Sequence, residues 1–432
     1  MRNYGIIFFR LGIFLLPTAF FISVIFFVTS LFISFFLNDL KEILFSRWNI
    51  IIFLAVIFII FICIVQTMIL KDINTNLITN LRGWDQSLSW IGLGNWIPLF
   101  FCFFGFQPYL VSSRDREIAA KILIAGSIPV LITGFGQLWF QWYGPLSTLN
   151  DLIIWFQRPI TEDYQGLSGL FNNQNYAGCW FNIIWPFAIA AFIKNSSNII
   201  KKSTTAIIAS SISISIFLTS SRSAWSGLLI SLPILFGKKV LYWFLLIFFA
   251  FFSLLFLLKH DSISYDFSNA FYIFNLNHIL DEFKNENYIN VESRSKIFLF
   301  AIKNIIINPW IGFGAGSFPV FYLDKFNVYI GHTHNLFIEL AFNYGLIIAL
   351  IVFITILLLI YFGFIKIFAR KLVKNINEIF FDKAWWASFF VLFCSQMVDI
   401  QYFDGRISII FWLLLAGIKN IVASKSYGIY TE

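Results

Sequence analysis

The main shortage in this sequence is charge. Only 12% of its 432 residues are Asp, Glu, Lys or Arg, whereas 59% are hydrophobic. A water-soluble domain carries roughly 25% charged residues, so this composition excludes a soluble protein and matches about 11 or 12 membrane spans of about 20 residues each. Aromatic residues reach 20%, which suits lipid-facing helices and excludes a disordered chain. The sequence therefore predicts an all-α polytopic membrane protein.

The sequence also has few cysteines, no evident signal-peptide cleavage site and no visible internal repeat. The four cysteines lie inside apolar runs without paired spacing, which predicts small buried hydrophobic residues: Cys63, Cys102, Cys179 and Cys394. No small-residue cleavage site follows the first apolar stretch, so we expect the first helix to remain as a span. No internal repeat of 20 to 50 residues is visible, which argues against a solenoid.

Charge placement predicts the topology. The net charge is +8, and in a membrane protein such an excess reports orientation rather than nucleic-acid binding. Ten apolar runs follow the N-terminal region: 49–70, 90–112, 118–141, 176–193, 204–219, 224–237, 240–258, 335–364, 384–399 and 405–421. The most cationic connectors are 113–121, 194–203, 238–239 and 365–383. If all four are cytoplasmic, then 142–175, the turn at Arg222 and the long segment 259–334 face outward.

The count of spans depends on residues 4–37, where Pro17 lies near the middle. A hairpin of two helices gives about 12 spans with both ends inside, and one long helix gives about 11. We favour the hairpin. The chain then divides into N-terminal transmembrane helices (1–258), one large periplasmic loop (259–334) and C-terminal transmembrane helices (335–432). All four histidines lie in that loop, and its apolar content favours a folded unit with short helices: His260, His278, His332 and His334.

An amide-rich segment, QGLSGLFNNQNYAG, occupies residues 165–178. Its side chains include Asn172 and Asn175, which come directly before a predicted span. Neutral amides at a membrane surface suit sugar hydroxyls. The alternative is a helix N-cap preceded by turn residues.

The segment LTSSRSAWSG, residues 218–227, places Arg222 between two apolar runs. An arginine near the bilayer is costly unless it is paired or reaches the interface, so one alternative is an arginine that snorkels at a helix end. Because Arg222 faces outward on the predicted topology, we favour an anion site in which the hydroxyl of Ser221 adds a donor. The planar guanidinium fork is suited to diphosphate oxygens.

A third polar region spans residues 308–345. Its glycine-rich turn, GFGAG, is not followed by a Lys-Ser or Lys-Thr pair, so a nucleotide P-loop is not supported. His332 and His334 supply only two of the ligands that a zinc site needs, so we expect no metal. His334 precedes a helix that Asn335 can cap; it is either a structural residue or a base for an acceptor hydroxyl, with Glu339 orienting it.

The order of these motifs resembles the O-antigen ligase and polymerase superfamily: Gly-Leu-Phe-Asn-Asn-Gln-Asn, then Thr-Ser-Ser-Arg-Ser-Ala, then Gly-Phe-Gly-Ala-Gly-Ser-Phe, then His334-Asn335. The resemblance covers roughly residues 165–350. It implies a GT-C-like inner-membrane glycosyltransferase of bacteria, with about 12 spans and a periplasmic active face.

The resemblance also implies substrates and roles. The donor would be an undecaprenyl-diphosphate-linked glycan and the acceptor lipid A-core or another glycan, in a metal-independent, inverting transfer without a cofactor. His334 would be the base, and Arg222 and Arg294 would hold the donor diphosphate. Family members often have an arginine before the amide motif, where this chain has Gly166 and the nearest candidate is Arg158, and a glutamate where this chain has Asn343.

Two other classes stay open. A multi-span solute or anion transporter has a similar number of spans, although transporters tend to place ionisable residues near the bilayer midplane and to show repeated halves. A flippase or scaffold would not need His334. Ligation, polymerisation and protein glycosylation are not separated by the sequence, with ligation preferred and polymerisation second.

Overall fold

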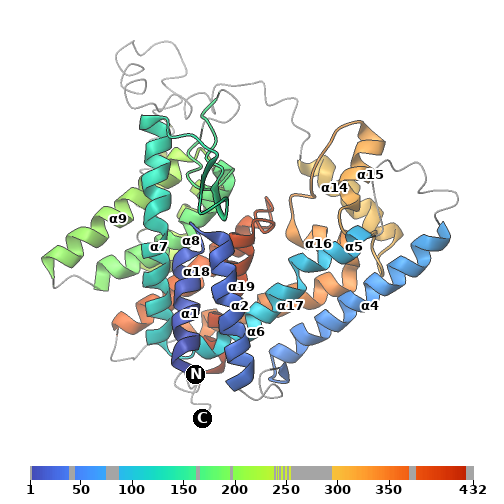
Figure 1. Cartoon of the computed structure of the whole chain (residues 1–432), viewed down its shortest axis with the longest axis horizontal. Coiled ribbons are helices and arrows are strands. Elements are labelled where there is room, and N and C mark those ends of the chain that lie inside the picture. Colours follow the sequence, from blue (N-terminus) through green and yellow to red (C-terminus); the bar gives the residue numbers. More distant parts are fainter. Residues whose placement is uncertain are drawn as a thin grey trace.

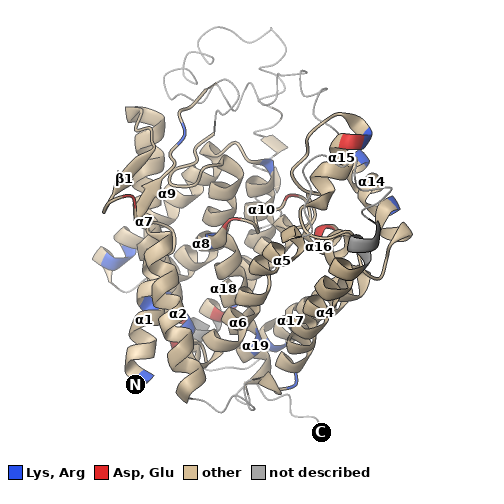
Figure 2. Ribbon diagram, turned by 45° about the vertical axis from the view of Figure 1, so that its right-hand side comes forward, with Lys and Arg blue, Asp and Glu red and all other residues tan. Residues whose placement is uncertain are grey.

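The computed structural model describes residues 2–37, 44–73, 87–161, 166–194, 198–237, 294–368 and 376–424, with isolated positions between 240 and 253. The molecule is mostly helical (Figure 1). In the described part of the chain, 8 helical segments are long and apolar enough to cross a membrane: Phe20–Leu37, Asn49–Met68, Ser87–Tyr109, Ser113–Phe140, Gln174–Lys194, Ile199–Leu218, Leu346–Phe368 and Gly405–Ala423. Most of each of these helices lacks charge (Figure 2). A polytopic membrane protein is therefore confirmed, and the count of 12 spans stays a prediction.

The N-terminal region forms the predicted hairpin. Helix α1 (Arg2–Leu15) and helix α2 (Phe20–Leu37) are separated by a short turn that contains Pro17. They run antiparallel, because the hydroxyl of Ser23 donates to the carbonyl of Gly12 at 2.7 Å while Phe9 and Phe27 pack further along. Pro17 lacks a backbone N–H and therefore suits the break between the helices.

Two predicted runs differ from the helices that form. The run 335–364 divides at Gly345 into α16 (Leu336–Tyr344) and α17 (Leu346–Phe368). Gly345 has a φ of 90°, a left-handed conformation that ends α16 and that glycine adopts without strain. The run 90–112 is built from shorter pieces, in order α5 (Ser87–Gly92), η1 (Leu93–Asn95), α6 (Ile97–Phe106) and η2 (Gln107–Tyr109). Most of the run 240–258 lies outside the described residues.

The segment 142–175, which we predicted to face outward, corrects the all-α prediction. Strands β1 (Leu146–Thr148) and β2 (Ile153–Trp155) form a short antiparallel ribbon there. The part of the predicted loop 259–334 that the structure describes contains α14 (Arg294–Ile307) and α15 (Ser317–Phe326), as expected for a folded unit with short helices. His260 and His278 lie outside the described residues.

A central group of helices forms the core. It contains α7 (Ser113–Phe140), α8 (Gln174–Lys194), α18 (Ile376–Ser395) and α19 (Gly405–Ala423), flanked by α4 (Asn49–Ile73), α9 (Ile199–Leu218) and α10 (Arg222–Phe236). Indole groups tie these helices together without leaving buried donors unpaired: Trp180 donates to the hydroxyl of Ser127 at 2.9 Å, and Trp385 donates to the carbonyl of Leu414 at 2.8 Å. Cys63, Cys102 and Cys179 are buried in the core and unpaired, as predicted, and Cys394 is partly buried.

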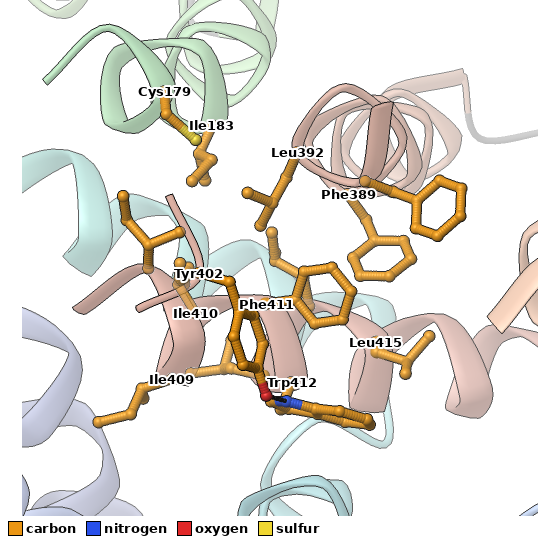
Figure 3. Packing of buried hydrophobic residues seen from close by; sticks show 14 of the residues in the cluster. Cys179, Ile183, Phe389, Leu392, Tyr402, Ile409, Ile410, Phe411, Trp412 and Leu415 are labelled. Carbon is orange, nitrogen blue, oxygen red and sulfur yellow. Dashed lines mark hydrogen bonds between the residues drawn. The ribbon is translucent and has the colours of Figure 1, made fainter. Parts of the chain in front are cut away.

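The turn between α18 and α19 is anchored to this core by Tyr402. Its hydroxyl accepts a hydrogen bond from the indole of Trp412 at 2.7 Å and donates to the carbonyl of Asn95 at 3.0 Å. Figure 3 shows the Tyr402 ring beside Phe411, with Phe389 and Leu392 of α18 above them. The fold therefore fixes the position of this turn, which carries part of the site described below.

Candidate functional site

The residue His334 lies between α15 and α16 with a φ of 55°, a left-handed conformation that is strained for a residue with a side chain. The next residue holds the helix start in place. Asn335 accepts from the backbone N–H of Ile338 at 3.0 Å, as an N-cap, and its amide donates to the carbonyl of Met397 at 2.8 Å. The predicted capping role of Asn335 is confirmed, and the cap also docks α16 on the turn between α18 and α19.

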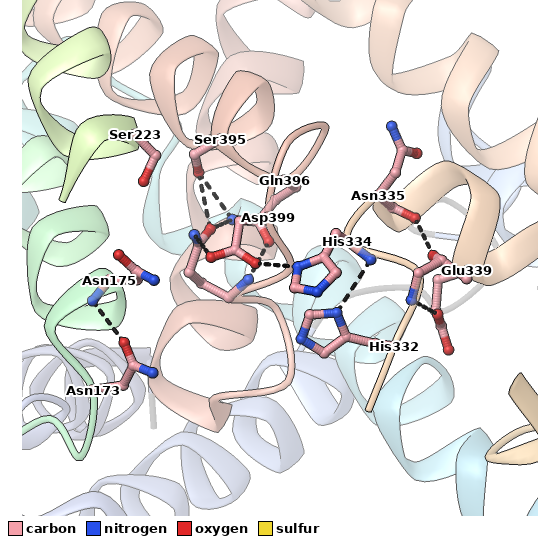
Figure 4. A network of polar contacts seen from close by, with 12 residues as sticks. Asn173, Asn175, Ser223, His332, His334, Asn335, Glu339, Ser395, Gln396 and Asp399 are labelled. Carbon is pink, nitrogen blue, oxygen red and sulfur yellow. Dashed lines mark hydrogen bonds and ion pairs between the residues drawn. The ribbon is translucent and has the colours of Figure 1, made fainter. Parts of the chain in front are cut away.

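The imidazole of His334 is paired with a carboxylate that sequence analysis missed. The distance from His334 Nδ1 to Asp399 Oδ1 is 2.9 Å, and the His334 side chain is 26% exposed while that of Asp399 is 11% exposed. Asp399 comes from the turn after α18, 65 positions away in sequence (Figure 4). In the sequence it is the last residue of the apolar run 384–399. The amides Gln396 and Gln401, which bracket it, are the signal that this end is polar.

A buried amide network fixes the carboxylate. Gln401 donates to Asp399 Oδ2 at 3.3 Å, and Gln396 donates to Gln401 Oε1 at 3.0 Å. The side-chain oxygen of Gln396 in turn accepts from the backbone N–H groups of Gln401 and Tyr402, at 3.0 and 2.9 Å. Because each partner is itself held, the carboxylate keeps a single orientation toward His334.

A hydrogen bond and nearby charges lower the pKa of the Asp399 carboxyl. Burial raises the pKa of Asp399, but the hydrogen bond from His334 and the charges of His334, His332 and Arg294 together hold it below its usual 3.8. An ionised carboxylate only accepts hydrogen bonds, so the Nδ1 of His334 carries the proton and donates it to Asp399. In the neutral imidazole this arrangement leaves Nε2 free to accept a hydrogen bond.

His332 lies against the same imidazole. The two ring centroids are 4.4 Å apart, and His332 Nδ1 accepts from the backbone N–H of His334 at 3.2 Å. Burial and the adjacent His334 lower the pKa of His332 from 6.5 to about 4, so His332 is neutral at physiological pH. It supports the backbone that presents His334.

The side chains of His332, His334 and Asp399 are also a candidate set of metal ligands. The donor atoms of His332, His334 and Asp399 lie within 4.8 Å of one another. The sequence offers only His332 and His334 as neighbouring ligands, and Asp399, which is distant in sequence, makes a third. Three protein ligands are the number found at catalytic zinc sites. In this structure the Nδ1 atoms of both histidines are engaged in hydrogen bonds within the group, which competes with metal ligation.

Glu339 does not orient His334 directly. Its Oε2 accepts from the backbone N–H of Thr333 at 2.9 Å, and its Oε1 accepts from the side-chain amide of Asn343 at 3.1 Å. Glu339 is buried, and the hydrogen bond that it accepts from the backbone of Thr333 fixes the residue directly before His334. Asn343 is a donor to this carboxylate, whereas a second carboxylate at that position would repel it.

The two arginines lie on separate elements. Arg294 is the first residue of α14, and its charge acts on both His332 and Asp399. Arg222 is the first residue of α10 and is exposed. The hydroxyls of Ser221, the N-cap of α10, and Ser223 are 2.9 Å apart. Figure 4 shows Ser223 facing the Asp399 turn from the side opposite His334.

The amide motif lies at the N-terminal end of α8, on the same side of the Asp399 turn as Ser223. Figure 4 shows Asn173 and Asn175 on the side of the Asp399 turn away from the histidines, and Asn173 Oδ1 accepts from the backbone N–H of Asn175 at 2.7 Å. Arg158 donates through Nε to Asn172 Oδ1 at 2.7 Å, so a guanidinium does accompany the motif. A Cβ at Gly166 would press on the carbonyl of Thr219, which explains why no larger residue stands there.

The glycine-rich turn is structural. The backbone N–H groups of Phe313 and Gly314 donate to the carbonyls of Phe342 and Asn343, at 2.8 and 2.9 Å. Those donors are therefore occupied by the end of α16 and are not free to cradle a phosphate. The absence of a P-loop, predicted from the sequence, agrees with this geometry.

Comparison with known proteins adds one finding. Residues 206–354 match the family model described as O-antigen ligase, a segment that begins in α9 and ends in α17. The match contains Arg222, Arg294, His332, His334 and Asn335. No curated protein matches the chain.

Proposed function

We propose that the chain is a member of the O-antigen ligase superfamily, whose model matches residues 206–354, and that it is a membrane glycosyltransferase. In this proposal it moves a glycan from an undecaprenyl-diphosphate-linked donor to an acceptor hydroxyl. The observation that carries this proposal is the His334–Asp399 pair at 2.9 Å in a largely apolar helical protein. A histidine held by an ionised carboxylate is a general base for an alcohol.

In the proposed reaction, the acceptor oxygen attacks the anomeric carbon of the glycan while its proton moves to His334 Nε2. The new carbon–oxygen bond forms as the bond from the anomeric carbon to the diphosphate oxygen breaks. The electron pair leaves with undecaprenyl diphosphate. Asp399 stabilises the imidazolium that results, because it is ionised and shares the Nδ1 proton.

The guanidiniums of Arg222 and Arg294 hold the donor diphosphate in this proposal. Planar guanidinium groups bind phosphate oxygens with two parallel hydrogen bonds and neutralise charge as it builds on the leaving group. The amides Asn172 and Asn175 and the guanidinium of Arg158 bind the glycan. A single displacement inverts the anomeric configuration.

The proposed reaction uses no metal ion. Two guanidiniums replace the charge that a metal would supply, and Asp399 already occupies one ring nitrogen of His334. Purified enzyme treated with EDTA should keep its activity. Loss of activity under EDTA that Zn²⁺ or Mn²⁺ restores would assign a metal to His332, His334 and Asp399 instead.

We place the protein in the inner membrane of a bacterium, with His334 on the periplasmic face. The cationic connectors support this orientation. Lys121 and Lys194 both contact Glu117 where α7 begins and α8 ends, and the positive-inside rule puts that end in the cytoplasm. Gln174 begins α8 at the other end, beside the amide motif. Ligation to lipid A-core is the preferred reaction and polymerisation the second.

Deletion of the gene tests the proposal in cells. Lipopolysaccharide and lipid-linked glycans from the deletion strain should show loss of long-chain glycan and accumulation of the donor, restored by wild type and not by His334→Ala. Free core would identify a ligase, and a single repeat unit on the core would identify a polymerase. An unchanged glycan profile, with altered solute uptake, would support the transporter instead.

A further inference from the structure

A polar cavity lies where α1 begins and α19 ends, and we call it the first cavity. It has a volume of about 490 Å³, and its lining includes Arg2 of α1, Gln107 of η2 and Lys419 of α19. Asn49 and Gln107 exchange two amide hydrogen bonds of 3.0 Å across it. The cavity is therefore a built polar site inside a helical protein of low charge.

An adjoining cavity extends the basic surface. It has a volume of about 400 Å³, shares Lys419 with the first and adds Arg47 and Lys366. The four cations come from parts of the chain far apart in sequence, and among the residues that the structure describes no Asp or Glu lines either cavity. Among the described residues, Arg2, Arg47 and Lys419 form no ion pair with a carboxylate. The positive-inside rule explains cations at one face of the membrane, but it does not explain their convergence on a cavity.

These cavities are separate from the proposed active site. Asp399 precedes the start of α19, whereas Lys419 lies 14 residues beyond Gly405, about 21 Å along the helix axis. A ligand of the basic cavities therefore binds at the opposite end of α19 from His334.

The surroundings of the cavity favour a lipid over a free anion. Helix α2 supplies Ser34 and Leu37 to the first cavity, and it also supplies one wall of an apolar groove of about 350 Å³. The described residues that line the groove are all hydrophobic: Val28, Leu31, Phe32, Phe35, Leu44 and Phe101. A phosphate group next to an acyl-chain groove is the arrangement that a phospholipid needs, and basic pockets between transmembrane helices bind anionic headgroups.

We propose that the two basic cavities bind the phosphate headgroup of an anionic phospholipid, with Arg47 and Lys419 as the principal contacts and an acyl chain along α2. Arg47 packs near the Trp48 ring, 5.9 Å from the centroid, which holds its guanidinium at the cavity mouth. Lys419 is common to both cavities and is partly buried, so it reaches a headgroup in either.

Native mass spectrometry of the purified full-length protein in detergent tests this proposal. Phosphatidylglycerol should remain bound. The affinity for phosphatidylcholine of the same chain length should be lower by about tenfold or more. The double substitution Arg47→Gln, Lys419→Gln should lower phosphatidylglycerol binding by about tenfold or more. Arg47→Gln alone changes an exposed side chain, so its smaller loss is measurable even if the double variant does not fold.

Lys201→Ala is the matched control, because it removes the same charge from an exposed side chain at the start of α9, away from both cavities. Binding by Lys201→Ala should equal that of wild type. Equal binding of the two phospholipids, or no loss in Arg47→Gln and in the double variant, would overturn the proposal. Displacement of phosphatidylglycerol by an equal concentration of inorganic phosphate would also overturn it and assign a free-anion site.

Discussion

The orientation of the His334 side chain depends on a carboxylate from another part of the chain. Asp399 is 2.9 Å from His334 Nδ1, and Gln401 holds its other oxygen. This geometry selects the tautomer in which Nε2 is free, which is the tautomer a base requires. At the residue scale, Asp399 is thus a positioning residue for His334.

Replacement of Asp399 tests this role. Asp399→Asn should lower kcat by about 100- to 10,000-fold, the usual contribution of general acid–base catalysis, with little change in the KM for the donor. Steady-state kinetics with purified enzyme would measure the split. Asp404→Asn is the control, because Asp404 lies in the same turn but pairs with Arg406, and it should lose less than about tenfold. Equal losses in both variants would indicate a structural role for the turn.

The lowered pKa of His332 predicts a pH effect on stability. In the folded protein the pKa is about 4, and in the unfolded chain it is near 6.5. Between these values the unfolded chain binds more protons, so the free energy of unfolding falls as the pH falls through that window. Asp399 contributes only at lower pH, because its pKa is below 3.8.

The apparent Tm in detergent should therefore fall more steeply from pH 6.5 to pH 4.5 in wild type than in His332→Gln. Circular dichroism at several pH values would measure both curves. Parallel curves for the two proteins would show that His332 is not buried as a neutral group.

At the scale of elements, the site depends on how the glycine-rich turn packs against the end of α16. A Cβ at Gly312 would lie 2.7 Å from the backbone nitrogen of Gly345, and a Cβ at Gly345 would press on the carbonyl of Trp310. Gln66 of α4 joins the two backbones, donating to the carbonyls of Ile311 and Asn343 at 2.7 and 2.8 Å. This contact sets the angle at which α16 presents His334.

Gly345→Ala should therefore lower stability by about 1 to 3 kcal/mol, because the φ of 90° and the contact with Trp310 both oppose a side chain. The apparent Tm in detergent would report this loss. Gly94→Ala is the control, since no atom lies within 4 Å of an added Cβ there, and its Tm should not fall. An unchanged Tm in Gly345→Ala would show that the turn and α16 are not closely packed.

Helices α7 and α18 are joined by the buried pair Arg116–Asp382. The guanidinium makes two hydrogen bonds to the carboxylate, at 2.8 and 2.9 Å, and both side chains are at most 2% exposed. Asp382→Asn should cost about 3 kcal/mol or more, because it leaves a buried charge without its counter-ion.

Arg114 provides the comparison, because its side chain is 66% exposed where it pairs with Glu117 at 3.1 Å. Arg114→Ala should change stability by less than about 1 kcal/mol. Denaturation curves in mixed micelles would compare the two variants. A loss in Asp382→Asn as small as that in Arg114→Ala would contradict the buried pairing.

At the scale of the whole molecule, composition and charge were enough to predict a helical membrane protein, the hairpin at Pro17 and short helices before His334. Those predictions depend only on composition, on charge and on residues close together in the chain. Asp399 could not be found this way, because its contact with His334 joins residues far apart in the chain. The ribbon of β1 and β2 was missed because its strands are only 3 residues long. Glu339 was assigned to the wrong partner, since spacing along a helix does not show which side its neighbours occupy.

The most direct test of the account is transfer by the purified protein in liposomes, with a lipid-linked glycan donor and a lipid acceptor. Wild type should form the acceptor-linked glycan and release undecaprenyl diphosphate. His334→Ala should bind the donor but fail to transfer it, and Arg222→Lys should restore little of the activity lost in Arg222→Ala, because an ammonium cannot replace a bidentate guanidinium. Normal transfer by His334→Ala would contradict the central claim that this histidine is the base of the reaction.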